Sequence, residues 1–374
     1  MRLSKSYIIK LIILTLLLII IYCLQTSQYW NKNNILNKND NIMENHSASL
    51  IRNSLMNNNN NNNINNKTTI INNENKNINK NNIYNVWCIF TKLTSTSPMR
   101  RKFRIFTESL LKYSSVNLTF NVIIDNSSRK IAETIINTHI IVFKKFVKIN
   151  YYDVHKLSNK IQDIVEVMSP KFSSNPGTYY SDALFFLSLG LHRIASVNDK
   201  YGIMLDVDTK LSTDIKLLFD EFNNFGDDSL FGLAPELTPV YRHILYLYRS
   251  KNSATLFGEP YSSGGYPGYN SGVVLFHLER LRNSLEYDQI VSEDMVHHMT
   301  EKYSFRGHLG DQDFYTLLGM ERPELIHNID CTWNRQLCTW WRDRGYSDVF
   351  GNYSSCNGKI KIWHGNCNTP IPDD

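Results

Sequence analysis

The 374-residue chain lacks several patterns that assign proteins to common binding classes. No basic stripe is interleaved with aromatic residues, and the formal net charge of +5 is spread thinly along the chain, so we expect no nucleic acid partner. The glycine-rich segment 264–272 contains no phosphate-loop lysine, which argues against a P-loop phosphate cradle. The six cysteines include no Cys-x-x-Cys pair, which argues against a zinc site.

The N-terminal residues predict a membrane anchor. Arg2, Lys5 and Lys10 precede an apolar stretch at 11–24. Counted from residue 7, with Lys10 reaching back to the interface, segment 7–24 approaches the roughly 20 residues that span a bilayer. No small-x-small cleavage site follows it, so we favour an uncleaved transmembrane signal anchor over a cleaved signal peptide. The positive charges place residues 1–6 in the cytosol and the rest of the chain in the lumen of the secretory pathway.

Asparagine dominates the segment after the expected anchor. Residues 25–84 include an unbroken asparagine run at 57–63 and almost no aromatic residues that could build a core. This composition predicts a disordered stalk, and a prion-like interaction segment is the alternative. Residues 85–374 then suit one large lumenal α/β domain.

Cysteine usage fits an oxidising compartment. Cys23 lies in the expected anchor, and Cys88, in the first expected strand, has the setting of a buried free thiol. The other four cysteines lie near the C-terminus: Cys331, Cys338, Cys356 and Cys367. Two disulfides explain them better than zinc, and the three possible pairings stay open. Asn-x-Ser/Thr sequons agree with a glycosylated domain and occur at Asn45, Asn66, Asn117, Asn126 and Asn352.

Hydrophobic patterning predicts alternating strands and helices, which is typical of an α/β fold. Expected strands lie at 86–91, 119–124, 140–146, 201–205, 229–234 and 273–278. Expected helices lie at 101–113, 128–138, 154–168, 181–195 and 215–222.

Two aspartates end one of these strands, in Tyr201-Gly-Ile-Met-Leu-Asp-Val-Asp208. Alternate side chains of a strand share a face, so the carboxylates of Asp206 and Asp208 point the same way at the carboxyl end of the strand, where open α/β sheets place ligands. Neighbouring carboxylates repel each other unless a cation lies between them, which predicts a divalent metal site. The alternative is an ordinary exit from a strand into a loop.

The glycine-rich segment ends at a second polar strand mouth. Asn270 and Ser271 precede the strand expected at 273–278 and can present hydrogen-bonding groups to a polar ligand. A tight turn with close backbone packing explains the same glycines without a ligand.

Four short segments, taken in order, resemble the family 8 retaining glycosyltransferases. They are Leu205-Asp-Val-Asp208, Asn270-Ser-Gly-Val273, Gly307-His-Leu-Gly-Asp-Gln-Asp313 and His364-Gly365. Longer runs resemble the xyloside xylosyltransferases within that family, namely Phe305-Arg-Gly-His-Leu-Gly-Asp-Gln-Asp-Phe314, Asp330-Cys-Thr-Trp-Asn-Arg-Gln-Leu-Cys-Thr-Trp-Trp-Arg342 and His364-Gly-Asn-Cys-Asn-Thr-Pro-Ile-Pro372. The resemblance implies a single GT-A domain, a Rossmann-like fold that binds nucleotide sugars.

The resemblance also implies an activity and a location. The enzyme would transfer xylose from UDP-xylose, in α1,3 linkage and with retained configuration, to a xylose on O-glucosylated EGF-like repeats. It would be a type II single-pass protein of the endoplasmic reticulum membrane, with the Golgi as the alternative. Two other functions stay open: a related transferase with another UDP-hexose donor or glycoprotein acceptor, and an inactive membrane-tethered sugar-binding module.

Individual residues take roles through the same resemblance. Asp206, Asp208 and His364 would hold a metal ion, and a histidine with two oxygen donors suits Mn²⁺, with Mg²⁺ as the alternative. The catalytic positions would be Gln312 and Asp311, and the acceptor-binding positions Trp333 and Trp340. The donor-binding positions would be Thr91, Asp182, Asp206, Asn270, Gly272, Gly365 and Asn366.

Several of these residues have a structural alternative. His364 follows an apolar segment and can be an ordinary hydrogen-bonded histidine, while Asp182 can cap the helix expected at 181–195. The tryptophans can form a small core braced by disulfides. Asp311 and Asp313 flank Gln312 as a hydrolase-style carboxylate pair would, but a hydrolase needs no metal, so we favour transfer.

The chain departs from the family after the His-Gly pair. Many family 8 enzymes have a lysine there that reaches the diphosphate, whereas this chain continues Asn366-Cys-Asn-Thr-Pro370. Asn366 can hydrogen-bond the phosphates instead, and the source of the positive charge stays open.

Overall fold

The computed structural model describes residues 84–93, 97–174 and 183–372, which belong to one compact unit, Asn77–Asp374. The expected tail, anchor and stalk lie outside the described residues, apart from Tyr84. Asp182, Cys23 and the sequons at Asn45 and Asn66 also lie outside them. Within the described ranges, no helix is long and apolar enough to cross a membrane.

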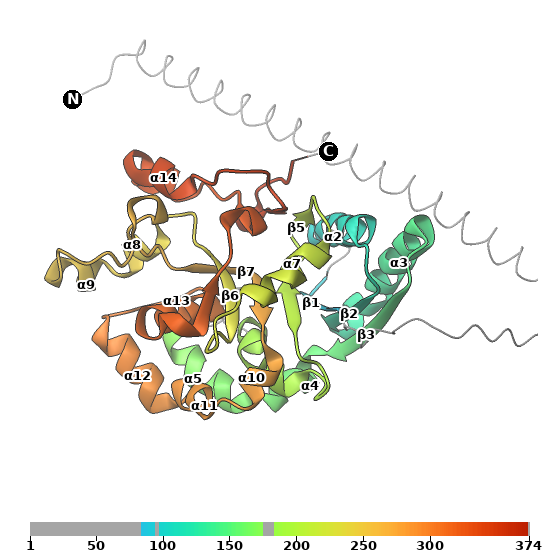
Figure 1. Ribbon diagram of the computed structural model, residues 1–374, viewed down its shortest axis with the longest axis horizontal. Helices are drawn as coiled ribbons and strands as arrows, with labels where there is room; N and C mark the ends of the chain where they lie inside the picture. The colour runs from blue at the N-terminus through green and yellow to red at the C-terminus, as the bar shows by residue number, and fades with distance from the viewer. Residues whose placement is uncertain (1–83, 94–96, 175–182, 373–374) are drawn as a thin grey trace, which may run out of the picture. The chain divides into compact units, whose positions relative to one another are not determined.

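A seven-stranded mixed sheet forms the centre of this unit (Figure 1). The strands, in their spatial order, are β3 (Val147–Asp153), β2 (Leu118–Ile124), β1 (Tyr84–Phe90), β4 (Gly202–Leu205), β7 (Tyr269–Phe276), β6 (Phe231–Pro235) and β8 (Ile326–Asn328). The neighbours from β3 to β4 are parallel, and so are β6 and β8. Strand β7 runs antiparallel to β4 and β6, so the sheet is not the wholly parallel one of a simple doubly wound fold.

Helices cover both faces of the sheet (Figure 1). The α-helices are α2 (Met99–Tyr113), α3 (Asn126–Phe143), α4 (Val154–Lys160), α5 (Gln162–Phe172), α6 (Leu191–Ile194), α7 (Ile215–Asp220), α8 (Val240–Ile244), α9 (Tyr246–Lys251), α10 (Leu278–Arg282), α11 (Leu285–Ile290), α12 (Glu293–Lys302), α13 (Asp311–Glu321) and α14 (Ser347–Ser354). Strand β1 shows why two cores form: Val86 and Cys88 face the core under α2, α3 and α7, and Trp87 faces the core under α5 and α10–α13.

A second, three-stranded sheet is responsible for the position of His364. Strand β10 (Ile362–His364) pairs antiparallel with β5 (Thr209–Leu211) and parallel with β9 (Arg335–Gln336). His364 is opposite Thr209, the residue directly after Asp208. A segment near the C-terminus is thereby fixed beside the acid pair that follows β4.

Two disulfides brace this part of the chain, as the sequence predicted. Cys331 pairs with Cys356 and Cys338 with Cys367, which settles the open pairing. Cys88 is a buried free cysteine, also as expected.

The prediction of a strand at 140–146 is wrong. Helix α3 continues through Phe143 and ends at Lys144, which has a left-handed conformation, and the strand is β3. Buried residues of α3 recur three or four positions apart, at Ala132, Ile136 and His139, so the helical pattern extends beyond Thr138. The apolar run from Ile140 onward is the continuation of this helix, since short apolar runs do not by themselves distinguish strand from helix.

The helix expected at 181–195 is also different in detail. Residues Ala183–Gly190 form a 3₁₀ helix, and only Leu191–Ile194 are α-helical. Six residues of the 3₁₀ helix are buried, and a Cβ on Gly190 would lie 2.2 Å from a side-chain carbon of Ile161. Close packing on all sides, rather than an amphipathic stripe, sets the conformation of this segment.

Candidate active site

The acid pair lies directly after β4, at the carboxyl end of the strand. The backbone nitrogen of Asp206 donates to the Gly272 carbonyl at 2.9 Å, and the Thr209 hydroxyl donates to the Asp206 carbonyl at 2.8 Å. These bonds fix the turn, so both carboxylates converge on one histidine. Nε2 of His364 lies 3.5 Å from Asp206 Oδ2 and 3.4 Å from Asp208 Oδ1.

The three side chains form a group that can hold a metal ion. One ligand atom from each of Asp206, Asp208 and His364 lies within 4.8 Å of the others. Burial alone would lower the pKa of His364, but the two carboxylates outweigh it and raise that pKa to about 10. Burial works to raise the pKa of Asp208, whereas His364 and Lys102 lower it far more. The two carboxylates thus create a negative potential at His364, and a cation at this position stabilises both of them.

A buried asparagine orients the histidine. Nδ1 of His364 lies 2.9 Å from Oδ1 of Asn334, which is fully buried. An amide oxygen only accepts hydrogen bonds, so Nδ1 carries the hydrogen and Nε2 points to the acid pair. A Cβ on Gly272 would lie 2.2 Å from Cε1 of His364, so only glycine lets the imidazole take this position.

Gln312 lies in the first turn of α13, and both the oxygen and the nitrogen of its side-chain amide make hydrogen bonds. Its Oε1 accepts from Nδ2 of Asn270 at 3.0 Å and from the backbone nitrogen of Ser271 at 3.4 Å. Its Nε2 donates to Glu236 Oε2 and to the Tyr241 hydroxyl, both at 3.3 Å. The structure therefore brings Gln312 and Asn270 together.

Asn270 is bonded to protein through every polar atom of its side chain. Its Nδ2 also donates to Glu236 Oε2 at 3.0 Å, and its Oδ1 accepts from the backbone of Gly272 at 3.1 Å and from Asn334 Nδ2 at 2.9 Å. In this arrangement Asn270 positions its neighbours.

Sequence reasoning missed Glu236. This carboxylate is 3 % exposed, and burial raises its pKa while the hydrogen bond from Asn270 lowers it. Glu236 directly follows β6, on the same side of the sheet as the other candidates. The rule that ligands gather at the carboxyl ends of strands could have found it.

The two aspartates beside Gln312 do not form a hydrolase-style pair. Asp313 is fully buried and accepts from the backbone nitrogens of His308 and Leu309, at 2.6 and 2.7 Å, and from the Tyr241 hydroxyl at 3.0 Å. It holds the segment before α13 in place. Asp311 instead bonds Ser188 and, at 3.0 Å, the hydroxyl of Ser271, and burial raises its pKa to about 7.

The other expected donor positions lie around the same edge. Thr91 directly follows β1. The backbone nitrogen of Gly365 donates to the Asp208 carbonyl at 2.8 Å. Asn366 Oδ1 accepts from the backbone nitrogens of Leu337 and Cys338, at 3.0 and 2.9 Å. Its amide nitrogen is thus the part that can donate to an anion.

The structure corrects one of the two acceptor positions. Trp333 is 1 % exposed and donates from Nε1 to Glu221 at 2.9 Å, so it is part of the core and is not open to an acceptor. Trp340 is 48 % exposed and is covered on one side by the guanidinium of Arg344, 4.8 Å from the ring centre. Trp341 packs edge-on against it.

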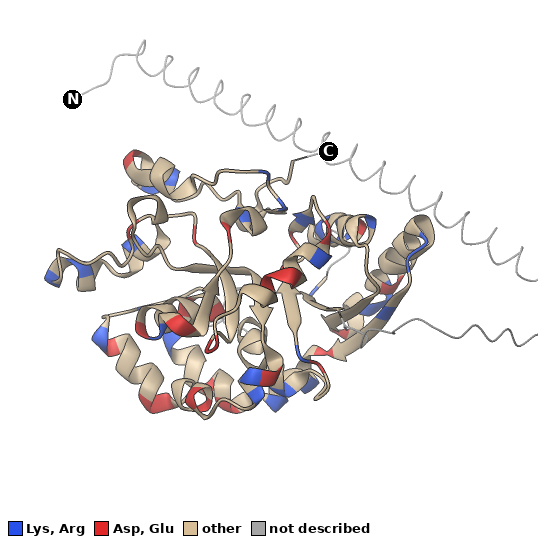
Figure 2. Cartoon of the chain, in the orientation of Figure 1, with Lys and Arg blue, Asp and Glu red and all other residues tan. Residues whose placement is uncertain are grey.

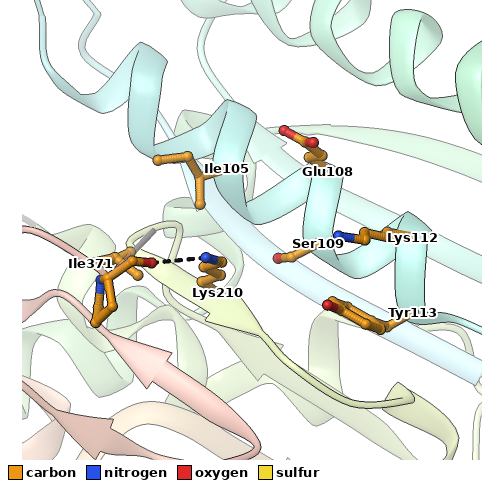
Figure 3. A pocket seen from close by; sticks show the side chains of 8 residues that line it. Ile105, Glu108, Ser109, Lys112, Tyr113, Lys210 and Ile371 are labelled. Atoms are coloured by element: carbon orange, nitrogen blue, oxygen red, sulfur yellow. Dashed lines mark hydrogen bonds between the residues drawn. The ribbon is translucent and has the colours of Figure 1, made fainter. Parts of the chain in front are cut away.

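A pocket of about 170 Å³ lies between α2, β5 and the C-terminal segment (Figure 3). Its lining includes Ser109, Tyr113 and Lys210, whose ammonium donates to the Pro372 carbonyl at 2.8 Å. None of the candidate metal or donor residues lines it, so we assign it no part in the site.

Comparison with known proteins identifies relatives of this chain. Xyloside xylosyltransferase 1 from Mus musculus is 45 % identical over 296 residues, which cover 78 % of this chain and 75 % of the mouse protein. The Homo sapiens protein of the same name is 44 % identical over the same shares. The crystal structure of the mouse protein in its apo form has a TM-score of 0.73 and covers 77 % of this chain and 99 % of that chain. No protein-family model matches the chain. The chain belongs to the xyloside xylosyltransferases, and it is a glycosyltransferase with a GT-A-like fold.

Proposed function

We propose that the chain is a metal-dependent retaining transferase that moves xylose from UDP-xylose to a xylose on O-glucosylated EGF-like repeats, in α1,3 linkage. The name of its relatives supports the xylose donor and the xyloside acceptor. The observation that carries the proposal is the convergence of Asp206, Asp208 and His364 at the carboxyl end of β4. Nucleotide-binding α/β sheets place the phosphates of their ligands at this edge.

The donor set fits a divalent ion. Two carboxylates and one imidazole suit Mn²⁺, or Mg²⁺ as the alternative, and three protein ligands leave coordination positions for oxygens of a diphosphate. Asn334 holds the imidazole with Nε2 toward the acid pair, as partners of metal-binding histidines do. When bound, the ion stabilises the negative charge of the departing diphosphate, an effect worth several kcal/mol.

The residues near the reacting sugar favour attack on the same face from which the phosphate departs. The amide of Gln312 is a poor nucleophile, and Oε2 of Glu236 already accepts from Asn270 and Gln312. In same-face attack, the new bond from the acceptor oxygen to the anomeric carbon forms as the bond to phosphate breaks. The departing phosphate oxygen takes the proton of the acceptor hydroxyl. Gln312 orients the sugar and stabilises its positive charge in the transition state.

Further roles follow the resemblance. Thr91 would contact the uracil, Asp182 the sugar hydroxyls, and Gly365 and Asn366 the diphosphate. Trp340 would stack on the acceptor. The two disulfides support an oxidising compartment, in agreement with a type II protein of the endoplasmic reticulum membrane or the Golgi.

The test uses the full chain, purified in detergent, with Mn²⁺, a panel of UDP-sugars and an α-xylosyl-glucoside acceptor. We expect transfer from UDP-xylose alone, loss of transfer after chelation of the metal, and no transfer by Asp208→Asn. Turnover of a different UDP-sugar would replace the donor in the proposal. A lack of transfer from every donor, by a folded protein that binds Mn²⁺, would contradict it.

A further inference from the structure

Lys102 lies against the acid pair on the side away from His364. Its ammonium is 3.2 Å from Oδ2 of Asp208, whereas the other oxygen of that carboxylate, Oδ1, faces Nε2 of His364 at 3.4 Å. The two oxygens of Asp208 are thus divided between two partners. A metal ion held by Oδ1 and His364 leaves the contact between Lys102 and Oδ2 possible.

The same ammonium contacts the segment that follows His364. It donates to Oδ1 of Asn368 at 3.1 Å. Asn368 and its neighbour Cys367 both have positive φ values, 57° and 55°, and Cys367 is tied to Cys338 by a disulfide. The segment after His364 contains no lysine or arginine of its own. Helix α2 brings the ammonium of Lys102 to this segment from a distant part of the sequence.

The start of α2 is unusually basic for a helix N-terminus. Its first turn contains no acidic residue, and Arg100, Arg101 and Lys102 follow one another there. Figure 2 shows this basic colouring on α2. The positive end of the helix dipole disfavours cations and favours anions at this position. The carboxylate of Asp208 offsets this effect at Lys102, and an anionic ligand at the same position adds to it.

We propose that Lys102 binds the diphosphate of the nucleotide-sugar donor and supplies the positive charge that the segment after His364 lacks. This inference rests on the proposed function of the same site. The lysine stem is long and flexible, so the ammonium can turn from Asn368 to a phosphate oxygen while it stays near Asp208. As the bond to the sugar breaks, the ammonium lies beside the phosphate on which negative charge develops.

A purely structural role for the ion pair explains less. Lys102 and Asp208 are each 16 % exposed, so the pair is accessible from the site and is not part of the core. The ion pair stabilises the carboxylate of Asp208, whose pKa is lowered by both His364 and Lys102. A charged hydrogen bond from Lys102 to a phosphate adds a role in ligand binding, and its loss weakens binding roughly 10- to 100-fold.

The experiment measures ligand binding by titration calorimetry on the full-length wild type, Lys102→Met, Lys102→Arg and the control Lys112→Met. Lys112 is a lysine of the same helix whose ammonium lies 5.2 Å from the ring centre of Tyr113. Each protein is titrated with Mn²⁺ alone, and then with UDP and with uridine in the presence of Mn²⁺. We expect Lys102→Met to bind UDP roughly 10- to 100-fold more weakly, with uridine affinity unchanged. Lys102→Arg keeps most of the UDP affinity, and Lys112→Met behaves as wild type.

The affinity for Mn²⁺ alone distinguishes diphosphate binding from mere positioning of Asp208. Removal of a cation beside the acid pair leaves Mn²⁺ affinity unchanged or increases it, if Lys102 serves the diphosphate. A loss of Mn²⁺ affinity as large as the loss of UDP affinity would show that Lys102 only positions the carboxylate.

Equal UDP affinity in wild type and Lys102→Met would also overturn the inference, even though the proposed function would stand. A wild type that binds no UDP would instead refute the proposed function itself. Unchanged uridine affinity shows that each variant is folded, and Lys102→Gln replaces Lys102→Met should the latter not fold.

Discussion

Asn334 joins His364 to the residues around Gln312 through one buried amide. Its Oδ1 lies 2.9 Å from Nδ1 of His364, and its Nδ2 donates to Oδ1 of Asn270, also at 2.9 Å. Asn270 in turn donates to Gln312 at 3.0 Å. The candidate metal ligand and the candidate sugar-binding amide are therefore held by one continuous chain of hydrogen bonds.

The first prediction concerns this chain. Asn334→Ala removes the partner of His364 Nδ1, so the imidazole loses its fixed orientation and tautomer. We expect Mn²⁺ affinity to fall roughly 10- to 100-fold, the usual effect of removing such a partner. Electron paramagnetic resonance of free Mn²⁺ in the presence of the protein measures this directly.

The control for Asn334 is another buried amide. Asn121, in β2, is 1 % exposed and accepts from Asn150 at 2.8 Å. Asn121→Ala removes a buried hydrogen bond of the same kind, so both variants lose stability by about 1–3 kcal/mol. Mn²⁺ binding falls only for Asn334→Ala. Equal Mn²⁺ affinity in the two variants would show that Asn334 stabilises the fold but does not orient His364 for metal binding.

The second prediction concerns Gln312. Gln312→Ala removes the amide that orients the sugar, and we expect kcat to fall roughly 100-fold or more, as for the loss of a transition-state donor. We expect UDP affinity to stay near that of wild type, because the role proposed for the amide concerns the sugar and not the diphosphate. Gln289→Ala, on the exposed side of α11, is the control. Near-normal kcat for Gln312→Ala would remove Gln312 from the catalytic residues.

The sequence predicted the parts of the site that depend on local pattern. An apolar strand that ends at Asp206 and Asp208 indicates a candidate metal site, because the period of a strand and the repulsion of carboxylates are local properties. The position of His364 came from resemblance alone. Its pairing with β5 explains why, since strand pairing between distant segments leaves no local signal in either segment.

The parts that sequence reasoning missed depend on which distant elements meet. Lys102 belongs to an amphipathic helix whose pattern indicates only a buried face. Asn334 directly follows a short 3₁₀ helix, Cys331–Trp333, and lies between two cysteines. Nothing in either pattern shows that Lys102 reaches Asp208 or that Asn334 reaches His364. The error at 140–146 has a different origin, because an apolar run at the end of a helix has the composition of a strand.

The third prediction separates the two disulfides. The Cys338–Cys367 bridge holds the segment that contains Asn366 and Asn368, whereas each cysteine of the Cys331–Cys356 bridge comes earlier in the chain than its counterpart. Replacing either pair with serine costs about 2–4 kcal/mol of stability, because the bridges close loops of similar length, 29 and 25 residues. We expect only the Cys338→Ser/Cys367→Ser variant to bind UDP more weakly, measured well below both unfolding transitions. Equal UDP affinity would show that the segment keeps its position without the bridge.

The fourth prediction is a dependence of stability on pH. The pKa of Asp311 is about 7 in the folded protein, raised by burial from 3.8. The folded state therefore binds more protons than the unfolded state between these values, and stability falls as pH rises through this window, by at most about 1.4 kcal/mol per pH unit. Asp311→Asn removes this titration, and the serine hydroxyls that bond Asp311 can reverse to suit the amide. Urea unfolding at pH 5 and pH 7.5 should show a smaller loss for Asp311→Asn than for wild type. An identical loss would contradict the raised pKa.

The fifth prediction tests Trp340 as the acceptor platform. Its exposed ring lies in the segment braced by the disulfides and is held by Arg344 and Trp341, so it is a rigid aromatic surface on the protein. Stacking of a sugar or peptide on such a ring contributes about 0.5–1.5 kcal/mol, so Trp340→Ala should raise KM for the glycopeptide acceptor up to about tenfold. KM for the donor and kcat stay near the wild-type values, because the role proposed for the ring concerns the acceptor and not the nucleotide sugar.

The control is Leu285→Ala, since Leu285 is 80 % exposed and belongs to α11. An unchanged KM for the acceptor would move the acceptor site away from Trp340, and a raised KM for the donor would show that the substitution disturbs the metal and donor site instead.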